Sequence, residues 1–126
     1  VDWNDMLRFF ELVWDGNQKH IEELPLETRI WSSSTLYSEA MQSERRQWFE
    51  NFQSKHKLNS DSLLQFHKTG GAINHEYGEI MDRGFVKTTS ITQVEKTNGD
   101  LTMYYENLQE HTITKTVFNL PQAVNE

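Results

Sequence analysis

Residues 85–120 read FVKTTSITQVEKTNGDLTMYYENLQEHTITKTVFNL, a segment rich in threonine, valine and isoleucine. These residue types favour β-strands. At its centre, Asn98-Gly99 supplies two residues that tolerate positive φ, as a type I′ hairpin turn requires. A two-residue loop at this point pairs Val94 with Met103 across the hairpin. The segment therefore predicts two antiparallel strands joined by a tight turn.

A second turn at residues 107–110 returns the chain as a third strand over residues 111–120. Ile113 and Val117 fall on one face of that strand, because side chains alternate along a strand, and Phe118 falls on the other. An antiparallel meander of this kind needs apolar cover on one face. The tryptophan- and phenylalanine-bearing segments upstream are the available cover.

The upstream sequence predicts helices. Residues 2–14 place Trp3, Leu7, Phe10 and Trp14 at helical spacing, beginning at Asp2 as a cap. Residues 35–56 predict a long helix that carries Trp48 and Phe52.

Shorter elements fill the remaining sequence. We expect a helical turn over residues 20–24, a short strand over 26–31, a helix after the cap residues 59–61, and a short helix over 73–81. Gly70-Gly71 separates the last two. The fold class is α+β, with N-terminal helices packed on a curved C-terminal antiparallel sheet, and residues 1–126 form a single domain.

Composition excludes several classes of function. The chain has 126 residues and a net charge of −7, which disfavours direct nucleic-acid binding through phosphate neutralisation. It has no cysteine, which excludes disulfides, thiolate metal sites and cysteine nucleophiles. No apolar run approaches the roughly 20 residues that a membrane span needs. We therefore expect a cytoplasmic protein without membrane contact, and no cofactor.

Aromatic residues suggest a ligand pocket between helices and sheet. The candidate pocket residues are Phe10, Trp14, Trp31, Trp48, Phe52 and Tyr105. Aromatic residues at helical spacing more often belong to a core than to a ligand site. The partner of such a pocket is a small apolar ligand, whereas a threonine- and tyrosine-bearing sheet face suggests a protein partner or a homodimer through the sheet.

Acid–base residues are the candidates for catalysis. Glu106, His111 and Tyr105 lie around the second turn, where a carboxylate or imidazole in an apolar pocket would serve as a general base. No complete catalytic motif accompanies them, so an enzymatic role is the second choice.

One motif has partial metal-ligand spacing. His75-Glu76-Tyr77-Gly78-Glu79 reads H-E-x-x-E, which on a helix would place His75 and Glu79 on one face. Two ligands do not make a zinc site, so Asp82 or His67 would have to join them. The interpretation we favour is a solvated helix face with no metal.

Acidic residues cluster in two places. One cluster comprises Asp15, Glu22, Glu23 and Glu27, and the other comprises Glu106 and Glu110. Acidic surfaces serve solubility, and they also bind basic partners. This suggests a third hypothesis, an acidic regulator or inhibitor of a basic nucleic-acid-binding protein.

Residues 9–31 resemble the start of nuclear-transport-factor-two-like domains, which include polyketide-cyclase-like and ketosteroid-isomerase-like proteins. The resemblance rests on FFELVWDGN at 9–17, IEEL at 21–24 and RIW at 29–31. It implies a cone-shaped fold with a pocket between helices and sheet. The family's acid–base residues have no counterparts here, so the resemblance implies ligand or partner binding rather than catalysis. We therefore rank a non-enzymatic binding or interaction domain first and a small isomerase or cyclase second.

Overall fold

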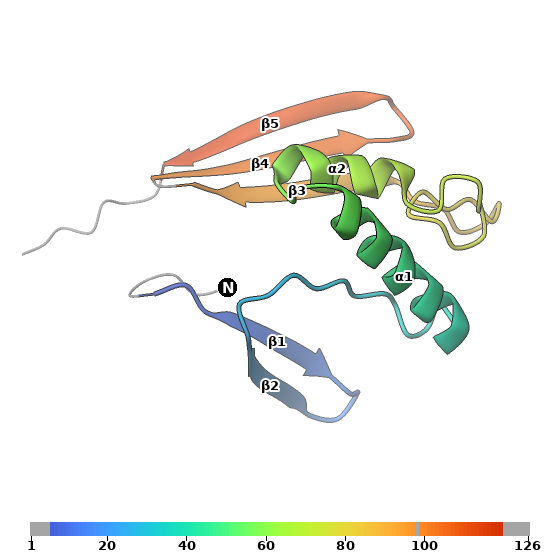
Figure 1. Ribbon diagram of the computed structural model, residues 1–126, viewed down its shortest axis with the longest axis horizontal. Coiled ribbons are helices and arrows are strands. Elements are labelled where there is room, and N and C mark those ends of the chain that lie inside the picture. Colours follow the sequence, from blue (N-terminus) through green and yellow to red (C-terminus); the bar gives the residue numbers. More distant parts are fainter. Residues whose placement is uncertain (1–5, 98, 120–126) are drawn as a thin grey trace, which may run out of the picture. The chain divides into compact units, whose positions relative to one another are not determined.

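A computed structural model describes residues 6–97 and 99–119 of the chain. The described chain is α+β, with two helices and two antiparallel sheets (Figure 1). It divides into two compact units, Val1–Trp31 and Ser32–Glu126, which are described separately below. The expectation of one domain over residues 1–126 stays a prediction. Within the described residues, neither helix has the length and apolar character of a membrane span.

The first unit is a β-hairpin. Strand β1 (Phe9–Trp14) pairs antiparallel with β2 (Lys19–Leu24), and Trp14 lies opposite Lys19 next to the turn. The predicted helix over residues 2–14 is therefore wrong for its described part, and the predicted helical turn over 20–24 is also wrong. Asp2 and Trp3 lie outside the described residues.

Asp15 explains why the chain reverses instead of continuing as a helix. Its Oδ1 accepts hydrogen bonds from the backbone N–H groups of Asn17 and Gln18, each at 2.8 Å, while Gly16 adopts a φ of 96°. His20 Nε2 lies 2.7 Å from Oδ2 across the hairpin. The Gln18 N–H, followed by His20, lowers the pKa of Asp15. An aspartate side chain that accepts hydrogen bonds from the backbone N–H groups of the next few residues stabilises a turn.

Residues 25–31 do not form the predicted strand. A tight turn begins at Pro25, whose carbonyl accepts the N–H of Glu27 at 2.9 Å. The segment then bonds to the hairpin through a side chain, because Trp31 Nε1 donates to Glu11 Oε1 at 2.6 Å. This side-chain hydrogen bond is present where the alternating sequence predicted the backbone hydrogen bonds of a β-strand.

Helix α1 (Glu39–Lys55) begins the second unit and confirms the long helix predicted over residues 35–56. The helix begins later than predicted because Ser38 is its N-cap, with its side chain accepting the N–H of Met41. Lys55 lies in the last turn, where the helix dipole favours a cation.

Helix α2 (Ser60–Thr69) follows the predicted cap residues. Asn59 and Ser62 form a reciprocal capping box, in which each side chain accepts the other's backbone N–H. The helix ends where the Gly70 N–H donates to the Phe66 carbonyl at 2.7 Å.

Residues 71–89 contain turns and an isolated bridge between Asp82 and Lys87 but no helix, so the short helix predicted over 73–81 is wrong. Asn74 Oδ1 accepts the N–H groups of Glu76 and Tyr77, each at 3.0 Å, and the Asn74 carbonyl accepts the N–H of Gly78 at 2.9 Å. Asparagine and glycine offer the backbone these local alternatives, which compete with helix formation.

The predicted meander is confirmed, with strand order β3-β4-β5. Its strands are β3 (Ser90–Lys96), β4 (Asp100–Asn107) and β5 (Thr112–Asn119). The predicted register is also confirmed, since Val94 pairs with Met103. The first strand begins at Ser90 rather than near residue 85. Asn98 lies outside the described residues, and the Thr97 N–H donates to the Asp100 carbonyl at 2.9 Å beside it.

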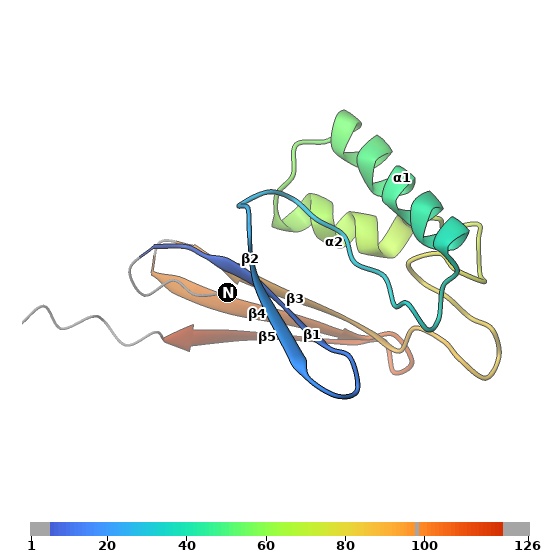
Figure 2. The same ribbon diagram turned by 90° about the horizontal axis from the view of Figure 1, so that it is seen from below.

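Both helices lie on the same face of this sheet (Figure 2). Helix α2 contacts β3, and Gln93 Nε2 donates to the Ser60 carbonyl at 2.7 Å. The buried apolar side chains of the unit are Phe49, Phe66, Met81 and Ile91. Helical cover on one face was predicted, and α2 contacts the sheet there, whereas the described part of residues 2–14 forms no helix.

Candidate functional site

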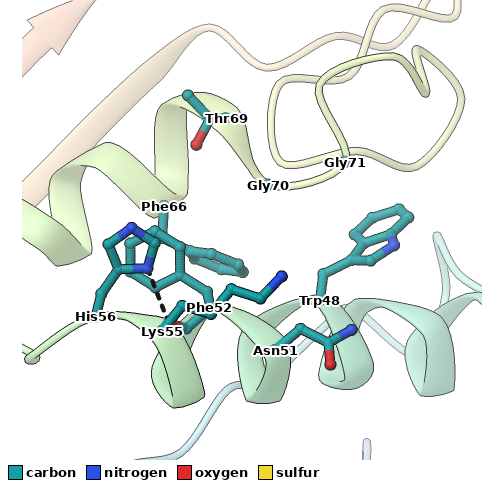
Figure 3. A pocket seen from close by; sticks show the side chains of 9 residues that line it. All are labelled: Trp48, Asn51, Phe52, Lys55, His56, Phe66, Thr69, Gly70 and Gly71. Atoms are coloured by element: carbon teal, nitrogen blue, oxygen red, sulfur yellow. Dashed lines mark hydrogen bonds between the residues drawn. The ribbon is translucent and has the colours of Figure 1, made fainter.

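A groove of about 290 Å³ lies between α1 and the C-terminal end of α2, and its lining side chains are drawn in Figure 3. The aromatic part of the lining comes from Trp48 and Phe52 of α1 and from Phe66 of α2. Phe66 is buried and contacts Phe52 at a ring-centroid distance of 5.4 Å. A cavity of on the order of 150 Å³ with apolar walls holds a benzene ring. The groove therefore has room for a small ligand.

Trp48 forms the end of the groove beside the Gly70-Gly71 corner. Its indole stacks on the ring of Tyr77, with centroids 5.7 Å apart and planes within 8° of parallel. Gly71 has a φ of 63°, and a Cβ built on it would lie 2.4 Å from the indole. Glycine is required at this position for two reasons. The left-handed backbone conformation disfavours other residues, and a Cβ atom would clash with the indole ring.

Arg45 holds the turn segment behind this corner. Its guanidinium is buried, and Nη1 donates to the carbonyls of Tyr77 at 2.6 Å and Gly78 at 3.0 Å. Nη2 lies 3.0 Å from Oε1 of the buried Glu79 side chain, as an ion pair without hydrogen-bond alignment. The guanidinium also stacks over the ring of Tyr37 at 4.5 Å. A planar group with several donors is suited to such a site.

Polar groups complete the groove lining. They are the side chains of Asn51, Lys55, His56 and Thr69. His56 stacks on Phe52 with centroids 4.0 Å apart, and its Nδ1 lies 3.0 Å from the Phe52 carbonyl. Because that contact requires Nδ1 to donate, Nε2 is the ring nitrogen that can contact a ligand.

A second polar cluster joins α2 to the sheet. Lys68 Nζ lies 2.7 Å from Glu106 Oε2, and the Tyr104 hydroxyl donates to the same oxygen at 2.5 Å. Lys68, followed by Tyr104, lowers the pKa of Glu106, and the carboxylate in turn raises the pKa of both Lys68 and Tyr104. Tyr104 also lines a cavity of about 230 Å³ between α2 and the sheet, together with Lys115.

The structure brings the three catalytic candidates together only in part, because His111 lies close enough to Glu106 to help lower its pKa, whereas Tyr105 points away from Glu106. Glu106 and Tyr105 are consecutive in β4, so their side chains point to opposite faces of the sheet. His111 adopts a φ of 55° in the following turn and lines a different cavity, of about 540 Å³, with Asp82 and Lys87. A lowered pKa makes Glu106 a weaker base than an ordinary glutamate.

Of the predicted pocket residues, the structure joins Trp48 and Phe52 in one groove. Phe10, Trp14 and Trp31 belong to the first unit, and Tyr105 lies in β4 and does not line the groove.

The sequence prediction missed Phe66, Lys55 and the two glycines of the groove. The sequence did carry a signal, since Gly70-Gly71 ends the helix that contains Phe66. The contact between α1 and α2 brings Phe66 and the two glycines to Trp48, whereas Lys55 lies on the same helix as Trp48.

His75 and Glu79 do not share a helix, because residues 71–80 form turns. Glu79 instead pairs with Arg45, and its Oε2 lies 3.6 Å from His67 Nδ1. Within residues 6–97 and 99–119, no three histidine, aspartate or glutamate side chains group as metal ligands would.

Most of the predicted acidic patch of the first unit is engaged locally. Asp15 contacts His20, Glu23 pairs with Arg8 at 2.6 Å, and Glu27 pairs with Arg29 at 2.9 Å. Arg8 also lowers the pKa of Glu23. These pairs reduce the local negative charge that a basic partner would meet.

Comparison of the chain with protein-family models, curated proteins and solved structures finds no match.

Proposed function

We propose that this chain is a binding module whose groove between α1 and α2 takes a small, flat, largely apolar ligand. The observation that carries the proposal is the groove itself, in which Trp48, Phe52 and Phe66 border a space of about 290 Å³. Ligand sites in proteins are concave, mostly apolar, and contain a small number of placed polar groups. The groove has this composition.

The lining favours binding over catalysis. Among the described residues, the groove lining contains no carboxylate, and His56 is the one imidazole in it. General acid–base chemistry needs a donor and an acceptor within hydrogen-bond reach of the reacting atoms. The alternative enzyme, of isomerase or cyclase type, would have to use Glu106 or His111, which lie outside the groove lining.

The experiment is calorimetric titration with 2-naphthamide, a flat and uncharged probe. The wild-type chain is expected to bind the probe, and Trp48→Ala is expected to weaken binding by about fivefold, since loss of an aromatic contact costs roughly 1 kcal/mol. Trp14→Ala is the matched control, because Trp14 is an exposed tryptophan of the hairpin. Absence of binding by the wild-type chain would refute the proposal.

A second candidate function is self-association through the three-stranded sheet. Strand β5 is an edge of that sheet, and it carries Lys115 as its one charged side chain. Edge strands with few charges offer free backbone donors and acceptors to another strand. Sedimentation velocity on the wild-type chain tests this, and a monomer at all concentrations up to the millimolar range would exclude it.

A further inference from the structure

We propose that the ligand of the α1–α2 groove carries an acidic group, and that Lys55 binds this group at the groove rim. The inference rests on the proposed function and adds the ligand's chemical class, a flat organic anion such as an aromatic carboxylate. Aromatic walls would hold the flat body, while a cation at the rim would hold the acid.

The charge of the groove lining differs in sign from that of the whole chain. The chain has 19 acidic residues against 12 lysines and arginines. The described lining nevertheless contains Lys55 and His56 and no carboxylate. An anion entering the groove therefore meets a cation and an imidazole, although the protein as a whole would repel it.

A carboxylate, that of Glu79, lies behind the Gly70 corner of the groove. A Cβ built on Gly70 would lie 2.7 Å from Glu79 Cγ, so this side chain lies directly behind the corner. Its carboxylate pairs with the buried Arg45 guanidinium at 3.0 Å, which neutralises it. The ion pair thus offsets a nearby negative charge that would oppose an anionic ligand.

The helix dipole alone does not explain the position of Lys55. A cation anywhere in the last turn stabilises the negative end of α1. Lys57 lies just beyond the same helix end and does not line the groove, whereas Lys55 does. Figure 3 shows the Lys55 side chain among the aromatic side chains of the lining. Comparing substitutions of Lys55 and Lys57 therefore distinguishes a contact with the ligand from a general effect of net charge.

The test compares 2-naphthoate with 2-naphthamide, which have nearly the same shape and differ in charge. For the wild-type chain in dilute buffer, we expect naphthoate to bind about fivefold more tightly, the size of a partly exposed ion pair. Lys55→Met is expected to abolish this preference, so that the two probes bind with equal affinity. Lys57→Met, with the same change in net charge, is expected to retain the preference.

The outcomes separate this inference from the proposed function. Equal affinities for the two probes in the wild-type chain, or a preference that survives in Lys55→Met, would overturn the inference and leave the proposed function standing. A preference lost equally in Lys57→Met would overturn it as well, because bulk charge would then be the cause. Binding of neither probe would overturn both proposals.

Discussion

The indole of Trp48 lies so close to Gly71 that a single added carbon at Gly71 would be 2.4 Å from it. No ordinary van der Waals contact is that short, so the width of the groove at this end depends on the absence of a side chain at Gly71. The Trp48 indole also stacks on the ring of Tyr77, and this contact holds it in place. The glycine, the tryptophan and the tyrosine therefore fix the end of the groove together.

Gly71→Ala is expected to destabilise the protein by about 3 kcal/mol, because left-handed backbone and overpacking each add to the cost. It is also expected to weaken naphthamide binding, since Trp48 must move. Gly84→Ala is the control, because Gly84 has a φ of 84° and a Cβ there meets nothing within 4 Å. Urea unfolding should show a loss of about 1 kcal/mol for this control. Equal losses for the two variants would contradict the importance of the Trp48 contact.

Arg45→Lys is expected to destabilise the protein by about 3 kcal/mol or more, although the charge is kept. Lysine cannot reach the Tyr77 and Gly78 carbonyls and Glu79 with one planar group, and it leaves a buried carboxylate poorly paired. Arg46→Lys, on the exposed side of the same helix, should change stability by less than about 0.5 kcal/mol. Denaturant unfolding measures both, and similar stabilities would contradict the role given to Arg45.

Glu106→Gln is expected to lose about 1 kcal/mol of stability at neutral pH, because the contact with Lys68 is partly exposed. A carboxyl whose pKa is lowered in the folded state adds stability above its unfolded pKa, here near 4.5, and loses it as the pH falls. The wild type and the variant should therefore converge as the pH falls from the unfolded pKa through the lower pKa of the folded state. Thermal unfolding between pH 3 and pH 7, in steps of about one unit, checks this. A difference that is independent of pH would contradict the lowered pKa of Glu106.

The C-terminal sheet could be predicted because its signals agree. The sequence Asn98-Gly99 predicts a tight turn, and the threonine- and valine-rich flanks favour strands, so the register through Val94 and Met103 follows from the predicted loop length. Cap residues likewise located α2, because Asn59 and Ser62 form the reciprocal bonds that their spacing suggests.

The N-terminal hairpin could not be distinguished from a helix in the same way. The sequence FFELVW at residues 9–14 is apolar at almost every position, and it therefore fits a period of 3.6 as well as a period of 2. Asp15-Gly16 is compatible with a helix end and with a hairpin turn. The hydrogen bonds from Asn17 and Gln18 to Asp15 decide for the turn, and composition does not reveal them.

The groove could be predicted only in part. Trp48 and Phe52 are one helical turn apart, so their common face followed from the sequence. Phe66 and Gly71 join them through the packing of α2 on α1, in which the ring of Phe49 contacts that of Phe66 at 5.1 Å, whereas Lys55 lies on α1 itself. Contacts between elements of this kind have no periodic signal along the chain.

The most direct test of the groove as the binding site is nuclear magnetic resonance of the isotope-labelled chain titrated with 2-naphthoate. We predict that the largest chemical-shift changes fall on the Trp48 indole N–H and the Gly70 and Gly71 amides. Changes centred instead on the cavity beside Tyr104 and Lys115, or on the hairpin, would contradict the assignment of the groove.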